Sequence, residues 1–456
     1  MQLYVTEISR YVIALLMAAY AVTGFLVFAF REGKKREIIY SVQVILLFAF
    51  QFACYAQIIA KTSSMHYLFL FAFQLIIFFA AVELIRMIYP DGNRMIMNHA
   101  CMLLVTGIVM ISRIAYDKAV RQFVIASVSL VLGLVIPELF YRLNLLKRLW
   151  VLYALTGTGA LVAVLLLGRV VNGSRLNYTI MGLTFQPSEL VKIVFILCIA
   201  GILQDKADLK RVALSGVIAA VHVLVLVMSK DLGSGLIYFV TWLALVFAAT
   251  GGFHYLALGV SMAVAASAAA YRIFPHIRSR VRAFKDPWSE IEGAGYQVAQ
   301  SLFGISSGGA FGLGLYAGSP GDIPFVASDA IFAGISEEMG IVTSVSMTLI
   351  CVSVFVMMMS EAVKLKDRFC RLTAVGIGIT YIFQVFLTIG GTTKFVPLTG
   401  VTLPLVSYGG TSVMVTLIMF GIFEGICLVR SEERFDELTG AGEDETSDEI
   451  LREDGI

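Results

Sequence analysis

The sequence predicts an all-α protein that is integral to a membrane, and both its composition and its apolar runs support this. Of its 456 residues, 59% are hydrophobic and 14% are charged, and the mean hydropathy is +0.86. Soluble domains are roughly half apolar and about a quarter charged, so a globule in water could not bury this much apolar surface. The composition also excludes disorder over most of the chain, and six scattered cysteines give no disulfide framework.

Thirteen apolar runs approach or exceed the roughly 20 residues that a spanning helix needs. We expect helices because the bilayer interior offers exposed backbone groups no water, and because the runs are too long for outer-membrane strands. The runs near 99–113 and 188–203 are short, so the count is uncertain by one or two. The runs lie near 11–30, 38–60, 67–89, 99–113, 122–141, 150–170, 188–203, 212–229, 234–250, 254–274, 330–362, 372–392 and 404–429.

Basic residues in short loops predict the orientation, because such loops stay in the cytoplasm. With thirteen spans, four basic clusters fall on one side, which places the N-terminus outside. A loop with Arg113, Lys118 and Arg121 opposes this weakly, since it would face outward. The tail after Arg430 holds eleven acidic and two basic residues and falls on the cytoplasmic side. The basic residues lie in short loops between apolar runs, so they do not suggest nucleic acid as a partner. The four clusters span 31–36, 142–148, 206–211 and 364–371.

Three non-helical segments share the predicted outer face: 172–187, a turn at Lys230–Asp231, and a long loop at about 275–329. A connection of about 50 residues among tight loops is usually functional. Its front, Arg278–Trp288, is basic and aromatic, which predicts an amphipathic helix in the membrane interface. Its end is rich in glycine, which suits a chain that follows a surface closely.

Ionisable residues at membrane depth are candidates for function. Lys192 begins the seventh run, and four polar residues crowd the same mouth: Arg175, Gln186, Ser188 and Glu189. The alternative for Lys192 is a side chain that extends to the lipid headgroups.

Asp231 and Asp329 each precede an apolar run, where an aspartate can also serve as a plain N-cap. Glu337 and Glu338 follow Asp329 by eight and nine residues, so Glu337 would lie near the helix face of Asp329. Two carboxylates in one cleft raise each other's pKa, which favours a general base. The five histidines form no metal motif, and no Walker loop or nucleophile elbow is present.

Cations and carboxylates at one membrane face suit a lipid with a phosphate-linked headgroup. The cations would stabilise a pyrophosphate leaving group, and a carboxylate would take the proton of an attacking sugar hydroxyl. Residue types alone leave two alternatives open: a transporter of a charged solute, and a receptor or scaffold for another membrane protein.

Short motifs follow one another along the chain: Asn172–Arg175, Phe185–Lys192, Asp231–Ser234, Asp286–Trp288, Gly293–Val298, Ser328–Asp329, Glu337–Gly340 and Leu403–Ser412. Together they resemble the signatures of the SEDS proteins, the shape, elongation, division and sporulation family of FtsW, RodA and SpoVE. The resemblance runs from about residue 99 to 428. It implies a SEDS-type bundle at 98–430 with about ten core helices and a large extracellular loop before the eleventh helix. Residues 1–97 would add about three N-terminal helices, and 431–456 would form the acidic tail.

The resemblance implies a peptidoglycan glycosyltransferase in the bacterial cytoplasmic membrane. Such an enzyme polymerises lipid II at the outer face during cell division or cell-shape maintenance. Its partners would be a class B penicillin-binding protein, which supplies the transpeptidase, and other divisome or elongasome membrane proteins. No cofactor is certain, and a divalent cation, Mg²⁺ or Mn²⁺, is left open.

By this resemblance Asp329 matches the family's essential aspartate and would be the general base on the acceptor hydroxyl, or would position a metal there. Arg175 and Lys192 would neutralise the pyrophosphate, and Asp231 would organise the groove. The remaining candidates for substrate binding are Gln186, Ser188, Glu189, Glu337, Glu338 and the turn residues Ser407, Tyr408 and Gly409.

Several positions depart from the family pattern: Ala327–Ala330 around the aspartate, Ser174–Leu176 around Arg175, and Lys230 before Asp231. A lipid II flippase and a non-catalytic scaffold for the penicillin-binding protein remain the alternatives. The enzyme is favoured because the polar groups gather at one face, whereas a flippase would also need them along a path through the bilayer.

Overall fold

The computed structural model of the chain describes residues 2–30, 33–171, 174–180, 183–293 and 295–453. Helices dominate, and they follow the order of the apolar runs. The α-helices are α1 (Gln2–Leu26), α2 (Lys34–Thr62), α3 (Met65–Ile88), α4 (Arg94–Ile114), α5 (Tyr116–Arg142), α6 (Trp150–Leu167), α7 (Pro187–Leu203), α8 (Leu209–Met228), α9 (Leu232–Thr250), α10 (Phe253–Ile273), α11 (Pro275–Lys285), α12 (Tyr296–Gly308), α13 (Ile331–Ala362), α14 (Arg368–Thr392) and α15 (Gly410–Glu453). Three short 3₁₀ helices are η1 (Val27–Ala29), η2 (Asn144–Arg148) and η3 (Pro320–Asp322), and three strands are β1 (Arg169–Val171), β2 (Ser174–Ile180) and β3 (Leu183–Phe185).

The predicted spans correspond to helices. Twelve helices in the described part of the chain are long and apolar enough to cross a membrane. The short seventh run forms α7, which has 17 residues and is not among these twelve helices. The prediction of a multi-pass helical membrane protein is therefore confirmed. The last span starts later than predicted, at Gly410, because residues 404–409 form a turn.

Local sequence explains where several helices begin. Asp208, Asp231 and Asp367 cap α8, α9 and α14, since each carboxylate accepts a hydrogen bond from a backbone N–H three residues later. Pro187 and Pro275 open α7 and α11, where a proline's missing N–H leaves no bond unmade.

The prediction missed a small sheet. β1, β2 and β3 form an antiparallel three-stranded sheet in that order, with Arg169 opposite Asn177 and Tyr178 opposite Phe185. Apolar Leu176, Tyr178 and Ile180 alternate with polar neighbours in β2, a period of two that is typical of a strand. The fold is therefore helical with a small sheet between α6 and α7.

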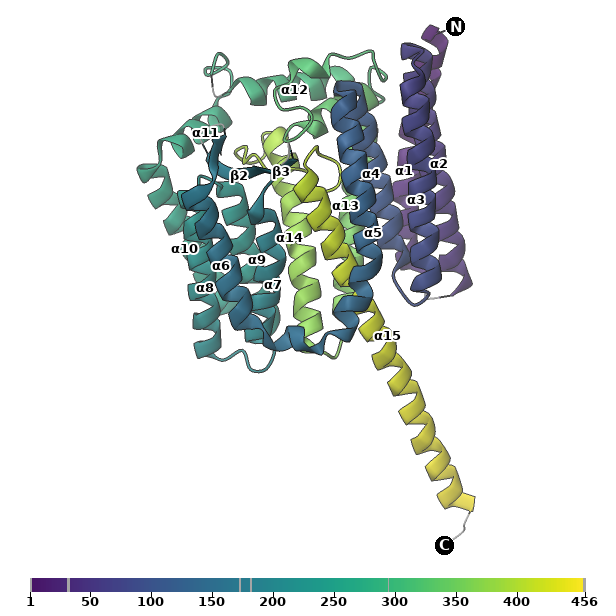
Figure 1. The fold of residues 1–456 in the computed structure, drawn as a ribbon, viewed down its shortest axis with the longest axis vertical. Helices are drawn as coiled ribbons and strands as arrows, with labels where there is room; N and C mark the ends of the chain where they lie inside the picture. Colours follow the sequence, from purple (N-terminus) through teal and green to yellow (C-terminus); the bar gives the residue numbers. More distant parts are fainter. Residues whose placement is uncertain (1, 31–32, 172–173, 181–182, 294, 454–456) are drawn as a thin grey trace.

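The helices form one bundle with the long loop over one end (Figure 1). α11, α12 and the strands cover the end at which the chain begins, and α15 extends from the opposite end. α1–α3 stand together beside the rest, with α1 packed on α13 and α2 and α3 packed on α4.

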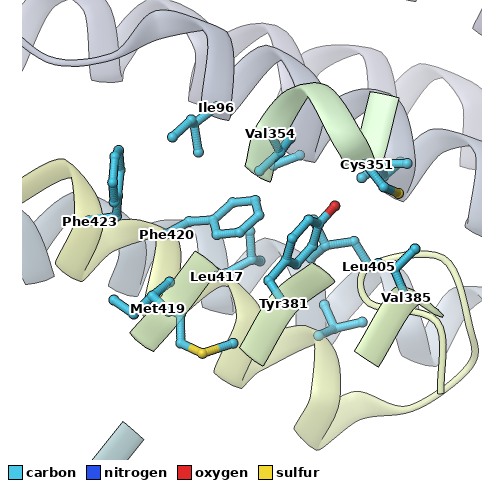
Figure 2. Close-up of a cluster of buried hydrophobic side chains, with 14 of the residues drawn as sticks. Ile96, Cys351, Val354, Tyr381, Val385, Leu405, Leu417, Met419, Phe420 and Phe423 are labelled. Atoms are coloured by element: carbon cyan, nitrogen blue, oxygen red, sulfur yellow. The ribbon is translucent and has the colours of Figure 1, made fainter. Parts of the chain in front are cut away.

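A buried cluster of apolar residues lies inside the bundle (Figure 2). Tyr381 of α14 meets Phe420 of α15 with 5.4 Å between ring centroids, and Val354 of α13 packs nearby. Leu405 enters this cluster from the turn before α15, fully buried and at a φ of 64°. Because leucine rarely adopts positive φ, burial of its side chain must hold the turn in place.

Candidate functional site

Asp329 lies at the end of the long loop, two residues before α13 begins at Ile331. The N-cap alternative is wrong here, because the capping position belongs to Ala330 and carries no side-chain cap. The Asp329 carboxylate instead faces Gly400: a Cβ added to Gly400 would lie 3.5 Å from Asp329 Oδ2 and 3.9 Å from an Arg280 nitrogen. Gly400 also has a φ of +76°, a backbone conformation that favours glycine at this point of the turn.

The pKa of the Asp329 carboxyl is raised toward neutral pH. Burial raises its pKa from 3.8 to about 6, while a hydrogen bond from Ser328 and the charge of Arg280 lower it. A general base works best when its pKa lies near the working pH. A carboxyl with this pKa has the proton affinity that a general base needs.

Arg280 of α11 is a site residue that the sequence did not single out. Its guanidinium donates to the carbonyl of Thr399 at 3.2 Å. Burial lowers the pKa of Arg280, and the charges of Asp231 and Asp329 raise it. One arginine thus lies within the field of both candidate aspartates, and it links two parts of the chain about 100 residues apart.

Asp231 combines capping with a second role. Its Oδ1 accepts the N–H of Ser234 at 3.1 Å, so the N-cap alternative is confirmed. Its Oδ2 accepts from the hydroxyl of Ser188 at 3.2 Å and from the amide of Gln186 at 3.4 Å. Two residues of the predicted mouth of α7, Gln186 and Ser188, therefore bond Asp231, which lies about 45 residues further along the chain.

Lys192 does not extend to the headgroups, so that alternative is wrong. Its side chain is 2% exposed, pairs with Glu189 at 2.7 Å and donates to Gln384 Oε1 at 2.7 Å. The amide of Gln384 donates in turn to the carbonyl of Thr402 at 3.0 Å. Because Glu189 already neutralises Lys192, an incoming phosphate would share this cation with a carboxylate.

The turn before α15 holds the backbone that leads to Asp329. The hydroxyl of Ser407 donates to the carbonyl of Ser328 at 2.5 Å, and the N–H of Tyr408 donates to the carbonyl of Ala327 at 2.7 Å. Gln122 of α5 closes the turn, donating to the Ser407 carbonyl and accepting from the Gly409 N–H. Ser407, Tyr408 and Gly409 therefore support Asp329, whether or not they contact a substrate.

Glu337 and Glu338 do not act on Asp329 as the sequence suggested. Both are buried in α13, where Glu337 accepts the N–H of Ser319 at 2.8 Å and Glu338 pairs with Arg113 at 3.0 Å. Burial alone raises the pKa of Asp329, Ser328 and Arg280 lower it, and Glu337 is not among the groups that shift it. Burial replaces the predicted repulsion between carboxylates, and the two glutamates hold the long loop.

Arg175 lies in β2 opposite Val170 of β1. Its side chain, and residues Asn172 and Gly173 of the same motif, fall outside the part of the chain that the structure describes. Its predicted contact with pyrophosphate stays a prediction.

No three His, Cys, Asp or Glu side chains gather as metal ligands within the described residues. Mg²⁺, however, is often held by one or two carboxylates together with substrate phosphates. Asp329 fits that mode as a single donor, whereas a cage made of protein ligands alone does not fit.

Comparison with known proteins finds a matching family and named relatives. The family described as "Cell cycle protein", FtsW/RodA/SpoVE, matches residues 93–432. The chain is 34% identical over 271 residues to "Peptidoglycan glycosyltransferase RodA" of Mycobacterium tuberculosis, covering 56% of this chain and 58% of that relative. It is 32% identical over 340 residues to "Probable peptidoglycan glycosyltransferase FtsW" of Aliivibrio salmonicida, covering 69% and 83%. The chain thus spans little more than half the length of the mycobacterial relatives.

Solved structures agree with this placement. A structure described as "Structural coordination of polymerization and crosslinking by a peptidoglycan synthase complex" superposes with a TM-score of 0.64 at 26% identity, over 74% of this chain and 98% of that one. Rod shape determining protein RodA of Thermus thermophilus shares the fold, with a TM-score of 0.55 at 24% identity over 74% and 97% of the two chains. On the family match over residues 93–432, the chain belongs to the FtsW/RodA/SpoVE family of cell cycle proteins.

Proposed function

We propose that this protein is a peptidoglycan glycosyltransferase that polymerises lipid II at the outer face of the bacterial cytoplasmic membrane. The observation that carries the proposal is the half-buried Asp329, whose carboxyl faces Gly400 together with the guanidinium of Arg280 and has its pKa raised by burial to about 6. The names of the RodA and FtsW relatives support the same activity.

The chemistry requires a base and a place for departing negative charge. The acceptor sugar hydroxyl forms a bond to the anomeric carbon of the donor, and the bond from that carbon to the pyrophosphate oxygen breaks with inversion. The hydroxyl proton passes to Asp329, which later releases it to water. Arg280 and Lys192 stabilise the departing lipid pyrophosphate, as preorganised cations do for charge that develops during a reaction.

Asp231 and its partners would orient the groove in this scheme. The hydroxyl of Ser188 and the amide of Gln186 are directed at Asp231, and Arg280 lies in its field. A lipid headgroup that enters here would meet donors and acceptors already held in place. If a divalent cation is bound, Asp329 would be its protein donor and would position the metal near the acceptor hydroxyl instead of acting as the base.

The orientation and the partner belong to the same proposal. We place the N-terminus and the loop over 275–329 outside, and the acidic tail 431–456 in the cytoplasm. The catalytic unit is 98–430 and the additional helices are 1–97. A class B penicillin-binding protein is the expected partner, since a related structure belongs to a complex that couples polymerization with crosslinking.

The test is polymerisation of lipid II by the purified full-length protein with its penicillin-binding partner. Asp329→Asn should lower the rate of glycan formation by about 100-fold or more, the range for loss of a general base. Asp322→Asn is the matched control, because Asp322 lies in the same loop and is exposed. Equal glycan formation by wild type and Asp329→Asn would exclude Asp329 as the base.

Two other outcomes identify the alternatives. If neither protein makes glycan but wild type moves lipid II across vesicles, the protein is a transporter. If neither activity is found and the penicillin-binding protein still binds, the protein is a scaffold.

A further inference from the structure

The helices α1–α3 lie outside the residues that match the family, yet they are joined to the core by buried polar contacts. His99 of α4 bonds the hydroxyl of Tyr20 in α1 at 3.1 Å and the hydroxyl of Ser353 in α13 at 2.9 Å. Asn98 donates to Gln43 of α2 at 3.1 Å. Interhelical hydrogen bonds of this kind hold membrane helices together, so α1–α3 form a fixed unit of the protein.

At the loop-covered end, α2 and α3 form hydrogen bonds with the segment 309–316 of the long loop. The amide of Gln57, fully buried, donates to the carbonyl of Leu315 at 3.1 Å. The hydroxyl of Tyr67 bonds the hydroxyl of Tyr316 at 2.7 Å. Figure 1 shows these helices rising beside the loop.

α1 contacts the same segment at Phe311 and Gly312. The guanidinium of Arg10 donates to the carbonyl of Gly312 at 3.5 Å. The ring of Tyr11 lies 4.9 Å from the ring of Phe311. All three N-terminal helices therefore contribute a side chain to this one stretch of eight residues.

The segment needs to be held, because Tyr316 adopts a φ of 66°. A bulky residue in that region is strained and persists only when its surroundings fix it. Its hydroxyl is bound by Tyr67, and the guanidinium of Arg113 lies 4.3 Å from its ring centroid.

The segment 309–316 in turn completes a break in α13. Gly340 has non-helical angles, φ 84° and ψ 165°. In a regular helix, Ile341 N–H would bond the Glu337 carbonyl and Val342 N–H the Glu338 carbonyl. Instead the two N–H groups donate to loop carbonyls, and the two carbonyls accept loop N–H groups. The bonds run from Ile341 to Gly309 at 3.0 Å, Val342 to Ala310 at 3.1 Å, Leu313 to Glu337 at 3.0 Å and Gly314 to Glu338 at 2.8 Å.

The break divides α13 into a short helix before Gly340 and a long one after it. The short helix starts two residues after Asp329, so its direction sets where that carboxylate lies. We infer that α1–α3 are a positioning module: they hold 309–316 in the break of α13 and so fix the short helix that begins just after Asp329. The catalytic meaning of this inference rests on the proposed function.

Hydrogen exchange of the full-length protein in lipid nanodiscs tests the mechanical claim. Gln57→Leu and Tyr67→Phe each remove one contact to the segment. We expect backbone exchange in both 309–316 and 331–339 to rise about fivefold to tenfold, the size expected for loss of one hydrogen bond. Tyr55→Phe is the matched control, because Tyr55 is a buried tyrosine of α2 whose hydroxyl bonds Gln74 within the N-terminal unit.

A double-mutant cycle sharpens the test. Tyr316→Phe and Tyr67→Phe both remove the bond between the two hydroxyls, and Tyr67→Phe also removes the bond to the carbonyl of Ser112 at 3.4 Å. The double variant should therefore exchange no faster than Tyr67→Phe alone. With lipid II as substrate, Gln57→Leu should lower kcat while KM and the thermal unfolding temperature stay near wild type.

Three results would overturn the inference: faster exchange confined to 309–316, equal changes in Tyr55→Phe, or a lower unfolding temperature that accounts for the loss of rate. Failure of the proposed function is distinguishable. If the wild-type protein makes no glycan, that function fails, whereas exchange in 331–339 still decides whether α1–α3 hold the break.

Discussion

Asp329 gains its chemistry from burial and not from a neighbouring carboxylate. Its raised pKa has a consequence for stability as well as for catalysis. A carboxyl with a folded pKa of about 6 and an ordinary value of 3.8 stabilises the folded state below pH 3.8, and that contribution is lost as pH rises through 6. Between these values the folded protein binds the proton more tightly than the unfolded chain.

The first prediction follows from this sign. If Asp329 is the base, kcat/KM for lipid II should fall about tenfold per pH unit below pH 6, while the protein stays folded. Asp329→Asn should retain only a low rate without this acidic limb. A pH–rate profile with parallel circular dichroism measures both. An acidic limb that survives in Asp329→Asn would assign the titration to another group.

Arg280 gives the second prediction. Its charge lowers the pKa of Asp329, so Arg280→Met should move the acidic limb to higher pH. The loss of a preorganised cation should also lower kcat by about 100-fold. Arg282→Met is the matched control, since Arg282 lies on the same helix with 64% of its side chain exposed. A profile unchanged from wild type in Arg280→Met would remove Arg280 from the site.

At the scale of elements, the apolar runs predicted the spanning helices because length and continuity decide which segments enter a membrane. The strands were missed because β2 has only seven residues and β1 and β3 have three each, too short for a pattern in one sequence to stand out. Arg280 was missed for another reason. Helix α11 carries Arg278, Arg280 and Arg282, and only the way the helix lies on the bundle selects the one that faces Asp329.

The packing of the helices also explains why the prediction for Glu337 and Glu338 was wrong. The spacing from Asp329 to Glu337 predicts a shared helix face only if the helix starts at Asp329 and runs straight. α13 starts later, and its carbonyls at Glu337 and Glu338 are turned to the loop at the Gly340 break. Sequence spacing could predict that these residues are near one another along the chain, but not which partner each carboxylate would find.

The break in α13 gives the third prediction. Gly340→Ala should destabilise the fold by more than about 1 kcal/mol, because its Cβ would lie 2.4 Å from the Gly312 nitrogen at a φ of +84°. Gly159→Ala in α6 is the control, since no atom lies within 4 Å of its Cβ. Thermal unfolding in detergent compares them. Equal unfolding temperatures would show that the break tolerates a side chain.

For the whole molecule, α1 starts and α15 ends at opposite ends of the bundle in Figure 1, which is the arrangement that the proposed orientation needs. In the basic loop that opposes the predicted orientation, Arg113 has a structural partner, whereas Lys118 and Arg121 still count against that orientation. Arg113 pairs with the buried Glu338 and donates to the carbonyl of Gly318, so its charge serves the long loop and is not a free signal for the cytoplasm.

The last prediction tests that orientation directly. All six native cysteines are buried, so a membrane-impermeant maleimide should label introduced cysteines with little background. Ser289→Cys, exposed in the long loop, should react in intact cells from which the outer barriers are removed. Lys206→Cys, exposed between α7 and α8 at the opposite end, should react only after the membrane is permeabilised. The reverse pattern would place Asp329 in the cytoplasm, where no lipid-linked polymer of the cell wall is extended, and would exclude the proposed polymerase together with its outer active site.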